Sequence, residues 1–92
     1  PLNFLNPISK TPLAKNIPLS PWEILRIIAI FRFILPDKQI RVCGGREKNL
    51  QVLQPLIFLA GADAIIIGDY LTTKGAPAKE DLEMIHNLGL EV

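Results

Sequence analysis

One arginine inside an apolar stretch is the residue of this sequence that points most clearly to chemistry. Arg41 lies in Ile40-Arg41-Val42-Cys43, which has the composition of a buried strand. Side chains alternate along a strand, so if Ile40 and Val42 face covering helices, Arg41 and Cys43 face the other side. A buried unpaired guanidinium is costly. We therefore expect an anionic partner for Arg41, either a bound group or a carboxylate from a neighbouring strand.

Asn3 raises the same question in an earlier apolar run, Leu2-Asn3-Phe4-Leu5. Its amide must find hydrogen-bond partners, and either a polar ligand or a bridge between two strands would supply them. Cys43 is interpreted as a small buried apolar side chain. Gly44-Gly45 would allow a tight turn from strand to helix, and would also let a ligand approach the backbone. The turn is the simpler interpretation.

We expect the polar residues after the second and third predicted strands to stabilise the fold rather than to carry chemistry. Arg46 and Glu47 are expected to form an ion pair at the rim of the fold. The loop 68–75 carries hydroxyls and Lys74 that would suit a substrate contact, although ordinary turn hydrogen bonds explain them as well. His86 is predicted to be exposed and without a chemical role.

Three predicted strands alternate with three predicted helices, and these elements must position the residues above. We expect strands at 2–6, 39–43 and 64–67, a loop at 7–20, and helices at 20–35, 48–60 and 79–87. Ser20, Pro21 and Glu23 predict a capping box for the first helix, which Pro36 ends. Gly61 and Gly89 are expected to end the second and third helices.

The first helix is predicted to bury one apolar stripe and to expose its arginines. The stripe at helical spacing consists of Ile24, Ile27, Ile28 and Phe31. Arg26 and Arg32 are expected to lie away from it. Trp22 and Phe31 are interpreted as packing residues rather than as parts of a binding site.

The alternation predicts an α/β fold with parallel strands and crossover helices. We expect residues 1–92 to form a single partial domain, the three C-terminal βα units of a (β/α)8 TIM-type barrel, with a doubly wound sheet as the alternative. In such a barrel, chemistry lies at the carboxyl ends of the strands. Open strand edges would make this piece prone to aggregation or assembly.

Composition excludes several classes of function. The chain has 92 residues and a net charge of +1, which gives no electrostatic case for binding nucleic acid or an anionic membrane. Its single cysteine excludes an intrachain disulfide and a zinc-type cluster. The longest apolar run, Ile24–Leu35, is too short and too charged to span a bilayer. Without a visible signal peptide, the expected location is the cytoplasm.

Several segments together resemble the C-terminal part of the biotin synthase family of radical S-adenosylmethionine enzymes. The matching residues are Pro1-Leu2-Asn3-Phe4-Leu5, Thr11-Pro12-Leu13, Trp22–Pro36, Ile40-Arg41-Val42-Cys43-Gly44-Gly45-Arg46-Glu47, Gly61-Ala62-Asp63-Ala64 and Gly68-Asp69-Tyr70-Leu71-Thr72-Thr73. The resemblance covers essentially the whole chain. It corresponds to the region shared by biotin and thiamin synthesis-associated proteins.

The resemblance implies an enzyme that converts dethiobiotin to biotin by radical sulfur insertion. It implies S-adenosylmethionine, a [4Fe–4S] cluster and a [2Fe–2S] cluster in a full-length protein that is a homodimer. Arg41 falls on the family's ligand to the [2Fe–2S] cluster, Asn3 on a substrate-binding asparagine, and Asn6 near the cosubstrate. The cysteines that hold both clusters are absent from this chain, so the piece alone is expected to be inactive.

Three other interpretations stay open. Gly44-Gly45 and Gly68 could belong to the phosphate-binding half of a different α/β barrel, although Asp69 would repel a phosphate. A related radical enzyme, such as a hydrogenase-cofactor maturase, could use the same region. The chain could also be a folding or dimer-interface module without chemistry.

Overall fold

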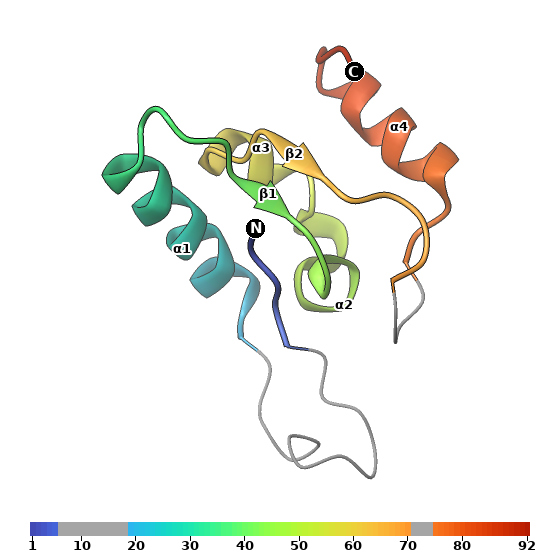
Figure 1. Cartoon of the computed structure of the whole chain (residues 1–92). Coiled ribbons are helices and arrows are strands. Elements are labelled where there is room, and N and C mark those ends of the chain that lie inside the picture. The colour runs from blue at the N-terminus through green and yellow to red at the C-terminus, as the bar shows by residue number, and fades with distance from the viewer. Residues whose placement is uncertain (6–18, 71–74) are drawn as a thin grey trace, which may run out of the picture.

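The computed structural model describes residues 1–5, 19–70 and 75–92 (Figure 1). Its elements follow in the order α1 (Pro21–Ile34), β1 (Arg41–Val42), α2 (Arg46–Leu50), the 3-10 turn η1 (Gln51–Leu53), α3 (Leu56–Ala60), β2 (Ala64–Ile65) and α4 (Ala78–Asn87). The predicted alternation of extended segments with helices is confirmed. Closure into a barrel stays a prediction.

Three extended segments lie side by side in chain order, with β1 in the middle. β1 pairs in parallel with β2, so that Arg41 lies beside Ala64 and Val42 beside Ile65. On the other side of β1, Leu2 forms a parallel bridge with Val42. The predicted strand at the start of the chain therefore pairs as expected. The order agrees with consecutive parallel βα units.

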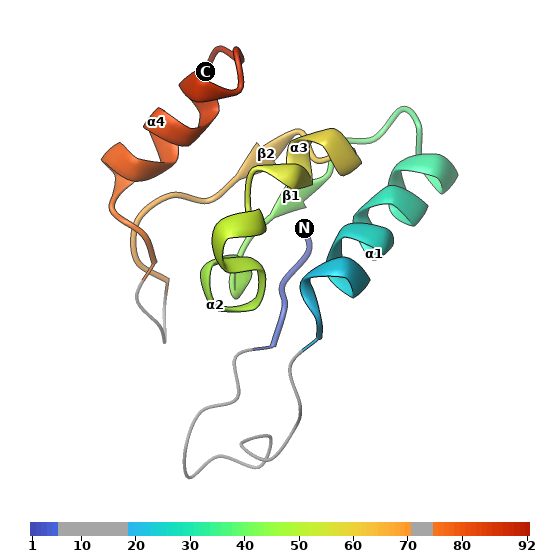
Figure 2. The same ribbon diagram turned by 180° about the vertical axis from the view of Figure 1, so that it is seen from behind.

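Within the described ranges, the helices that pack on these extended segments lie on one face. Figures 1 and 2 show α1, α2 and α3 on the same side of β1 and β2, while α4 stands apart beyond β2. The buried core lies under the three helices and consists of Phe4, Ile24, Leu25, Ile28, Val42, Leu50, Ile57 and Ala62. Among the residues that the structure describes, no helix lies over the opposite face, on which Arg41 is exposed.

The start of α1 forms as its sequence predicts. The Ser20 hydroxyl accepts a hydrogen bond from Glu23 N at 3.2 Å, and the Glu23 carboxylate accepts one from Ser20 N at 3.1 Å. This capping box satisfies two backbone donors that the helix itself leaves free. Pro21 occupies the first turn, where its missing N–H costs nothing.

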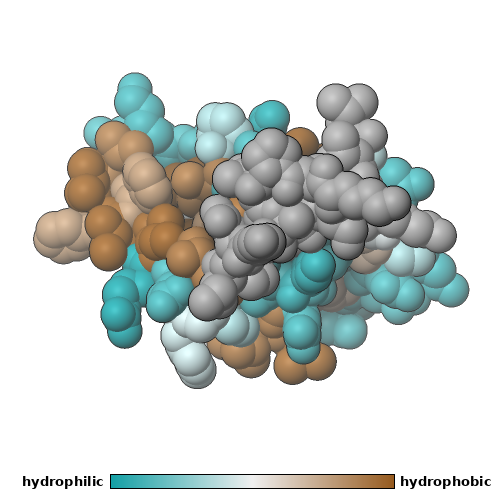
Figure 3. Space-filling model, turned by 90° about the horizontal axis from the view of Figure 1, so that it is seen from below, coloured by the Kyte–Doolittle hydropathy of each residue, from teal (hydrophilic) through white to brown (hydrophobic). Residues whose placement is uncertain are grey.

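The apolar stripe of α1 is rotated from its predicted position. Leu25 is buried beside Ile24 and Ile28, and Arg32 continues this face in the last turn. Phe31 is therefore displaced to the margin, with 39% of its surface exposed, and Trp22 is 64% exposed. The prediction that these two aromatic residues pack was wrong. Figure 3 shows the apolar surface that gathers over α1.

The predicted single helix over 48–60 was wrong, because the segment forms α2, η1 and α3. The chain turns at Gln51, whose φ is +49°. Pro55 has no N–H and its ring clashes with the carbonyl four residues earlier, which is that of Gln51. The break therefore follows from Pro55. Gly61 ends α3 with φ of +129°, as predicted.

Candidate functional site

Arg41 lies on the uncovered face of the extended segments. The predicted alternation holds for Ile40, Arg41 and Val42, since Ile40 and Val42 are 5% and 0% exposed while Arg41 is exposed. Cys43, expected on the same face as Arg41, is only 5% exposed. Arg41 lines a hollow of about 220 Å³ together with Pro1, Gln39 and Ala64. Its guanidinium has no hydrogen-bond or ion-pair partner among the described residues. Among residues 1–5, 19–70 and 75–92, Arg41 is exposed rather than buried, and the expected anionic partner of its guanidinium stays a prediction.

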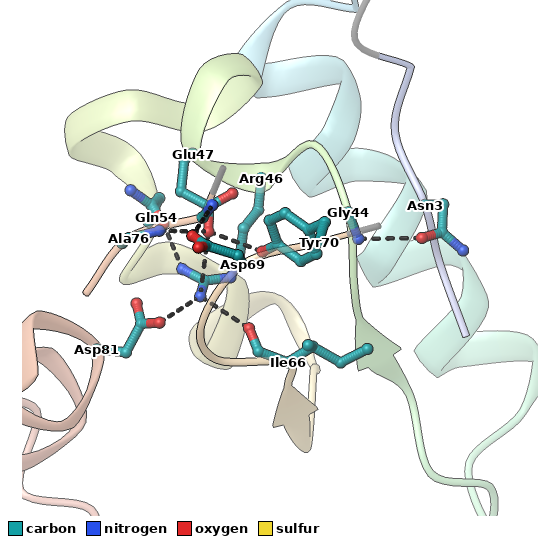
Figure 4. Close-up of polar contacts among 11 residues, drawn as sticks. Asn3, Gly44, Arg46, Glu47, Gln54, Ile66, Asp69, Tyr70, Ala76 and Asp81 are labelled. Atoms are coloured by element: carbon teal, nitrogen blue, oxygen red, sulfur yellow. Dashed lines mark hydrogen bonds and ion pairs between the residues drawn. The ribbon is translucent and has the colours of Figure 1, made fainter. Parts of the chain in front are cut away.

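Asn3 bridges two extended segments. Its Oδ1 accepts a hydrogen bond from Gly44 N at 3.0 Å, and Figure 4 shows the carboxamide directed at the turn after β1. The side-chain nitrogen Nδ2 has no partner within the described residues. The strand-bridging interpretation is thus confirmed, and Nδ2 stays available as a donor. Asn6 lies outside the described residues.

The glycines after β1 form the tight turn that was predicted. Gly45 has φ of +86° and precedes α2. A Cβ at this position would collide with the carbonyl of Phe4, so only glycine fits this turn without displacing the neighbouring segment. Cys43 is 5% exposed, which confirms its interpretation as a buried small side chain.

A polar cluster centred on the buried Arg46 follows this turn, and the sequence indicated only part of it. We define the Arg46 cluster as Arg46, Glu47, Gln54, Tyr70 and Asp81 (Figure 4). The Arg46 side chain is fully buried and lies 2.6 Å from Asp81 Oδ2 and 3.4 Å from Glu47 Oε1. It also donates to Gln54 Oε1 at 2.5 Å and to the Ile66 carbonyl at 3.0 Å.

Burial and charge act against each other on Arg46. Desolvation lowers the pKa of its guanidinium, but the hydrogen bond to Asp81 and the charge of Glu47 raise it, with a net pKa above the ordinary value. Arg46 is therefore charged at every pH at which the protein would fold. The predicted ion pair with Glu47 is present. It is part of a larger buried arrangement, since Asp81 comes from α4, 35 residues away.

Glu47 connects the Arg46 cluster to the chain after β2. Its Oε1 accepts hydrogen bonds from the Tyr70 hydroxyl at 2.7 Å and from Ala76 N at 3.4 Å. Burial, and then the contact with Glu47, raise the pKa of the Tyr70 phenol. The hydroxyl of Tyr70 thus links the chain after β2 to Glu47. Thr72, Thr73 and Lys74 lie outside the described residues.

A second polar cluster lies at the opposite end of the strands. Arg32 was expected to lie away from the core, but its guanidinium contacts the Gly61 carbonyl at 3.0 Å and the Asp63 carboxylate. It also donates to the carbonyls that follow α1, at Leu35, Pro36 and Lys38. This is a correction: a long arginine at a helix end reaches carbonyls that the helix leaves free.

Asp63 completes this second cluster. Its carboxylate accepts a hydrogen bond from Ile40 N at 2.8 Å, just before β1. That backbone hydrogen bond, with Arg32 beside it, lowers the pKa of the carboxyl group. Asp63 and Arg32 thus connect α1, the start of β1 and the start of β2.

The described residues cannot hold a metal cluster by themselves. They contain no group of three or more His, Cys, Asp or Glu side chains close enough to bind a metal ion. Arg41 could contribute one contact to a group held by other residues. His86 is exposed, as predicted. Within ranges 1–5, 19–70 and 75–92, every helix is too short or too polar to cross a bilayer.

Comparison with known proteins gives a consistent result along the chain. Residues 1–91 match the family described as Biotin and Thiamin Synthesis associated domain. The chain is 55% identical over 92 residues to biotin synthase of Geobacter sulfurreducens and 58% identical over 92 residues to that of Geobacter metallireducens. It is 55% identical over 91 residues to biotin synthase of Clostridium acetobutylicum. The matches cover 99–100% of this chain, which spans about 28% of the length of each relative.

Proposed function

The chain belongs to the family of biotin and thiamin synthesis-associated domains, and we propose that it is the C-terminal part of a biotin synthase. The observation that carries the proposal is an identity above 50% along the whole chain to three proteins named biotin synthase. The full-length protein would convert dethiobiotin to biotin. It would do so as a cytoplasmic homodimer in which this segment forms three βα units of a (β/α)8 barrel.

The position of Arg41 supports a role as ligand to a [2Fe–2S] cluster. Its guanidinium, a cationic group by its chemistry, has no partner among the described residues, and Arg41 lines a hollow on the exposed side of the sheet. An iron–sulfur cluster held by thiolates is anionic, so it would supply the negative partner that this arginine lacks. Because the described residues lack a metal-binding group of their own, the other ligands would come from the rest of the parent protein.

Asn3 would assist by binding substrate on the same face. Its Oδ1 is engaged by Gly44 N, which fixes the plane of the carboxamide and leaves Nδ2 as a directed donor. Asn6 would lie near S-adenosylmethionine. When bound, the [4Fe–4S] cluster with S-adenosylmethionine would supply the radical, and the [2Fe–2S] cluster the sulfur. This chain's own residues would orient the substrate and contact one cluster.

The alternative phosphate site receives less support from the turn after β1. Such a site needs free backbone N–H groups, but Gly44 N already donates to Asn3 Oδ1. The helix that follows, α2, has only five residues. Glu47 also lies in its first turn and would oppose an anion there.

The test is made on the full-length parent protein, reconstituted anaerobically with iron and sulfide. We expect two clusters by iron content and by optical and paramagnetic spectra, and formation of biotin from dethiobiotin. Arg41→Ala should change the [2Fe–2S] signal and leave the [4Fe–4S] signal intact. Arg26→Ala, which removes an exposed arginine of α1, is the matched control and should change neither. One cluster or none in the wild type would contradict the proposal.

A further inference from the structure

The face of α1 that points away from the core carries large apolar side chains. We define the outer stripe as four exposed residues of this face at helical spacing, Trp22, Arg26, Ile30 and Phe33. Trp22 is 64% exposed, Ile30 51% and Phe33 90%. Single exposed apolar side chains are common, but a contiguous apolar stripe marks an interaction surface. Figure 3 shows apolar surface gathered over α1.

The helix α4 of the same chain shows the opposite pattern. Its exposed residues are mostly polar and include Lys79, Glu80, Glu83 and His86. In α1, by contrast, the only charged residues are Glu23, Arg26 and Arg32, and Arg32 lies against Gly61 at the end of α3. A helix that is apolar nearly all round is normally covered on every side. The outer stripe therefore predicts a partner that α4 does not need.

The rest of the parent chain would leave the outer stripe free. In the proposed α/β barrel the helices form an outer ring. Each helix then meets the strands on one face and the neighbouring helices on its two sides, while its outward face is left to solvent. The partner of the outer stripe is therefore expected to be a separate molecule.

The order of residues along the outer stripe fits a second copy of α1. Trp22 and Phe33 place an aromatic ring at each end of the stripe, roughly 16 Å apart at 1.5 Å per residue. Between them lies Ala29, a small exposed residue beside which another helix can approach closely. If two copies of α1 pack antiparallel about a twofold axis, Trp22 of each copy lies opposite the partner's Phe33. The two aromatic pairs so formed are favourable contacts.

Arg26 suits the same antiparallel arrangement. Helical side chains lean toward the N-terminus of their helix, so Arg26 leans toward its own Trp22 and away from the twofold axis. That direction brings it toward the partner's Phe33, on which a guanidinium can stack. The two arginines therefore need not approach each other.

The area of the outer stripe is sufficient to form the centre of a dimer contact. An aromatic side chain can bury about 150–250 Å², so Trp22 and Phe33 at their observed exposures offer roughly 300 Å² per copy. Two copies would bury about 600 Å² through these rings, a large share of the roughly 1,200–2,000 Å² of a stable interface. We propose that two copies of the parent protein associate through the outer stripe, with α1 antiparallel to the partner's α1. That the parent protein is a homodimer rests on the proposed function, whereas the contact is assigned from α1.

The experiment measures the dimer dissociation constant of the full-length reconstituted protein by analytical ultracentrifugation. Phe33→Glu buries a carboxylate against the partner's Trp22 at two symmetric places, and should raise the dissociation constant at least about a hundredfold. Trp22→Lys should do the same. The double variant Trp22→Lys/Phe33→Glu sets each introduced lysine opposite an introduced glutamate, and should restore association to within about tenfold of wild type. Val52→Glu is the matched control, because Val52 is 88% exposed on η1, outside the stripe, and its dissociation constant should not change.

Hydrogen exchange of residues 21–34 in the wild type provides a readout that needs no variant. Exchange should be slower at a protein concentration above the dissociation constant than below it. A monomeric wild type, unchanged exchange, or a Phe33→Glu variant as dimeric as wild type would each overturn the inference. A double variant that stays dissociated would overturn the antiparallel arrangement. If the wild type forms no biotin, the proposed function fails, and ultracentrifugation still decides whether the outer stripe joins two copies.

Discussion

Replacing Asp81 by alanine should destabilise the full-length parent protein far more than any exposed substitution on α4. Asp81 Oδ2 lies 2.6 Å from Arg46 Nη2, and the two side chains are 4% and 0% exposed. Removing one partner of a buried ion pair costs about 3–5 kcal/mol, because the remaining charge stays buried without compensation. Glu47 still faces the guanidinium at 3.4 Å, so we expect the lower end, about 3 kcal/mol.

Two further variants separate charge from hydrogen bonding. Asp81→Asn keeps an oxygen that can accept from Arg46 and removes only the charge, so a loss of about 1–2 kcal/mol is expected. Glu83→Ala is the matched control, since it removes an ion pair on the same helix whose side chains are 86% and 61% exposed. Exposed pairs contribute about 0.2–1 kcal/mol.

Urea-induced unfolding of the parent protein, followed by circular dichroism, measures these differences. The order of stability should be wild type, then Glu83→Ala, then Asp81→Asn, then Asp81→Ala. A loss for Asp81→Ala no larger than that for Glu83→Ala would refute the reasoning. It would mean that Arg46 finds compensation without α4, and that the ion pair is not what fastens this helix.

Two more predictions concern the turn after β1 and the cluster at the opposite end of the strands. Gly45 and Gly68 share φ of +86°, but a Cβ would meet the Phe4 carbonyl at Gly45 and nothing at Gly68. In urea unfolding, Gly68→Ala should therefore lower the free energy of unfolding by about 1–2 kcal/mol, and Gly45→Ala by about 2–5 kcal/mol. Equal losses for the two variants would contradict the predicted collision. The pKa of the Asp63 carboxyl is lowered on folding, mainly by the hydrogen bond from Ile40 N. Its contribution to stability is therefore complete above its unfolded pKa of about 4 and is lost as pH falls through the folded value. Asp63→Asn should lower the free energy of unfolding at pH 7, and the gap to wild type should shrink below about pH 4; a gap that does not change with pH would contradict this prediction.

Local signals in the sequence predicted the local structure well. Ser20, Pro21 and Glu23 predicted the start of α1 because a capping box depends on residues three apart. The alternation at β1 separated Val42 from Arg41 because strand periodicity is a property of the backbone itself. The local sequence also contained the signal for the break before α3, because the ring of Pro55 would clash with the Gln51 carbonyl in a continuous helix. It was missed because the apolar pattern of the segment suits a continuous helix.

Long-range polar contacts could not be predicted in the same way. The partners of Arg46 lie at Gln54, Ile66 and Asp81, at separations of 8, 20 and 35 residues. No periodicity in the sequence encodes such pairings, and Asp81 looks like an ordinary first-turn acid of α4. The role of Arg32 was hidden for the same reason. In the candidate site, the apolar neighbours of Arg41 marked it as unusual. Its exposure could not be predicted in this way, because it depends on which other parts of the protein pack on that face of the sheet.

The two clusters also constrain how the length of this chain can vary. β2 is anchored at its start, where Asp63 meets Arg32, and at its end, where the Ile66 carbonyl meets Arg46. An extended segment advances about 3.3 Å per residue, so an insertion or deletion between these two positions would unseat one anchor. A shift of one residue would also turn Ile65 away from the core. Homologous chains should therefore accept length changes outside these anchors and keep the spacing from Asp63 to Ile66 constant.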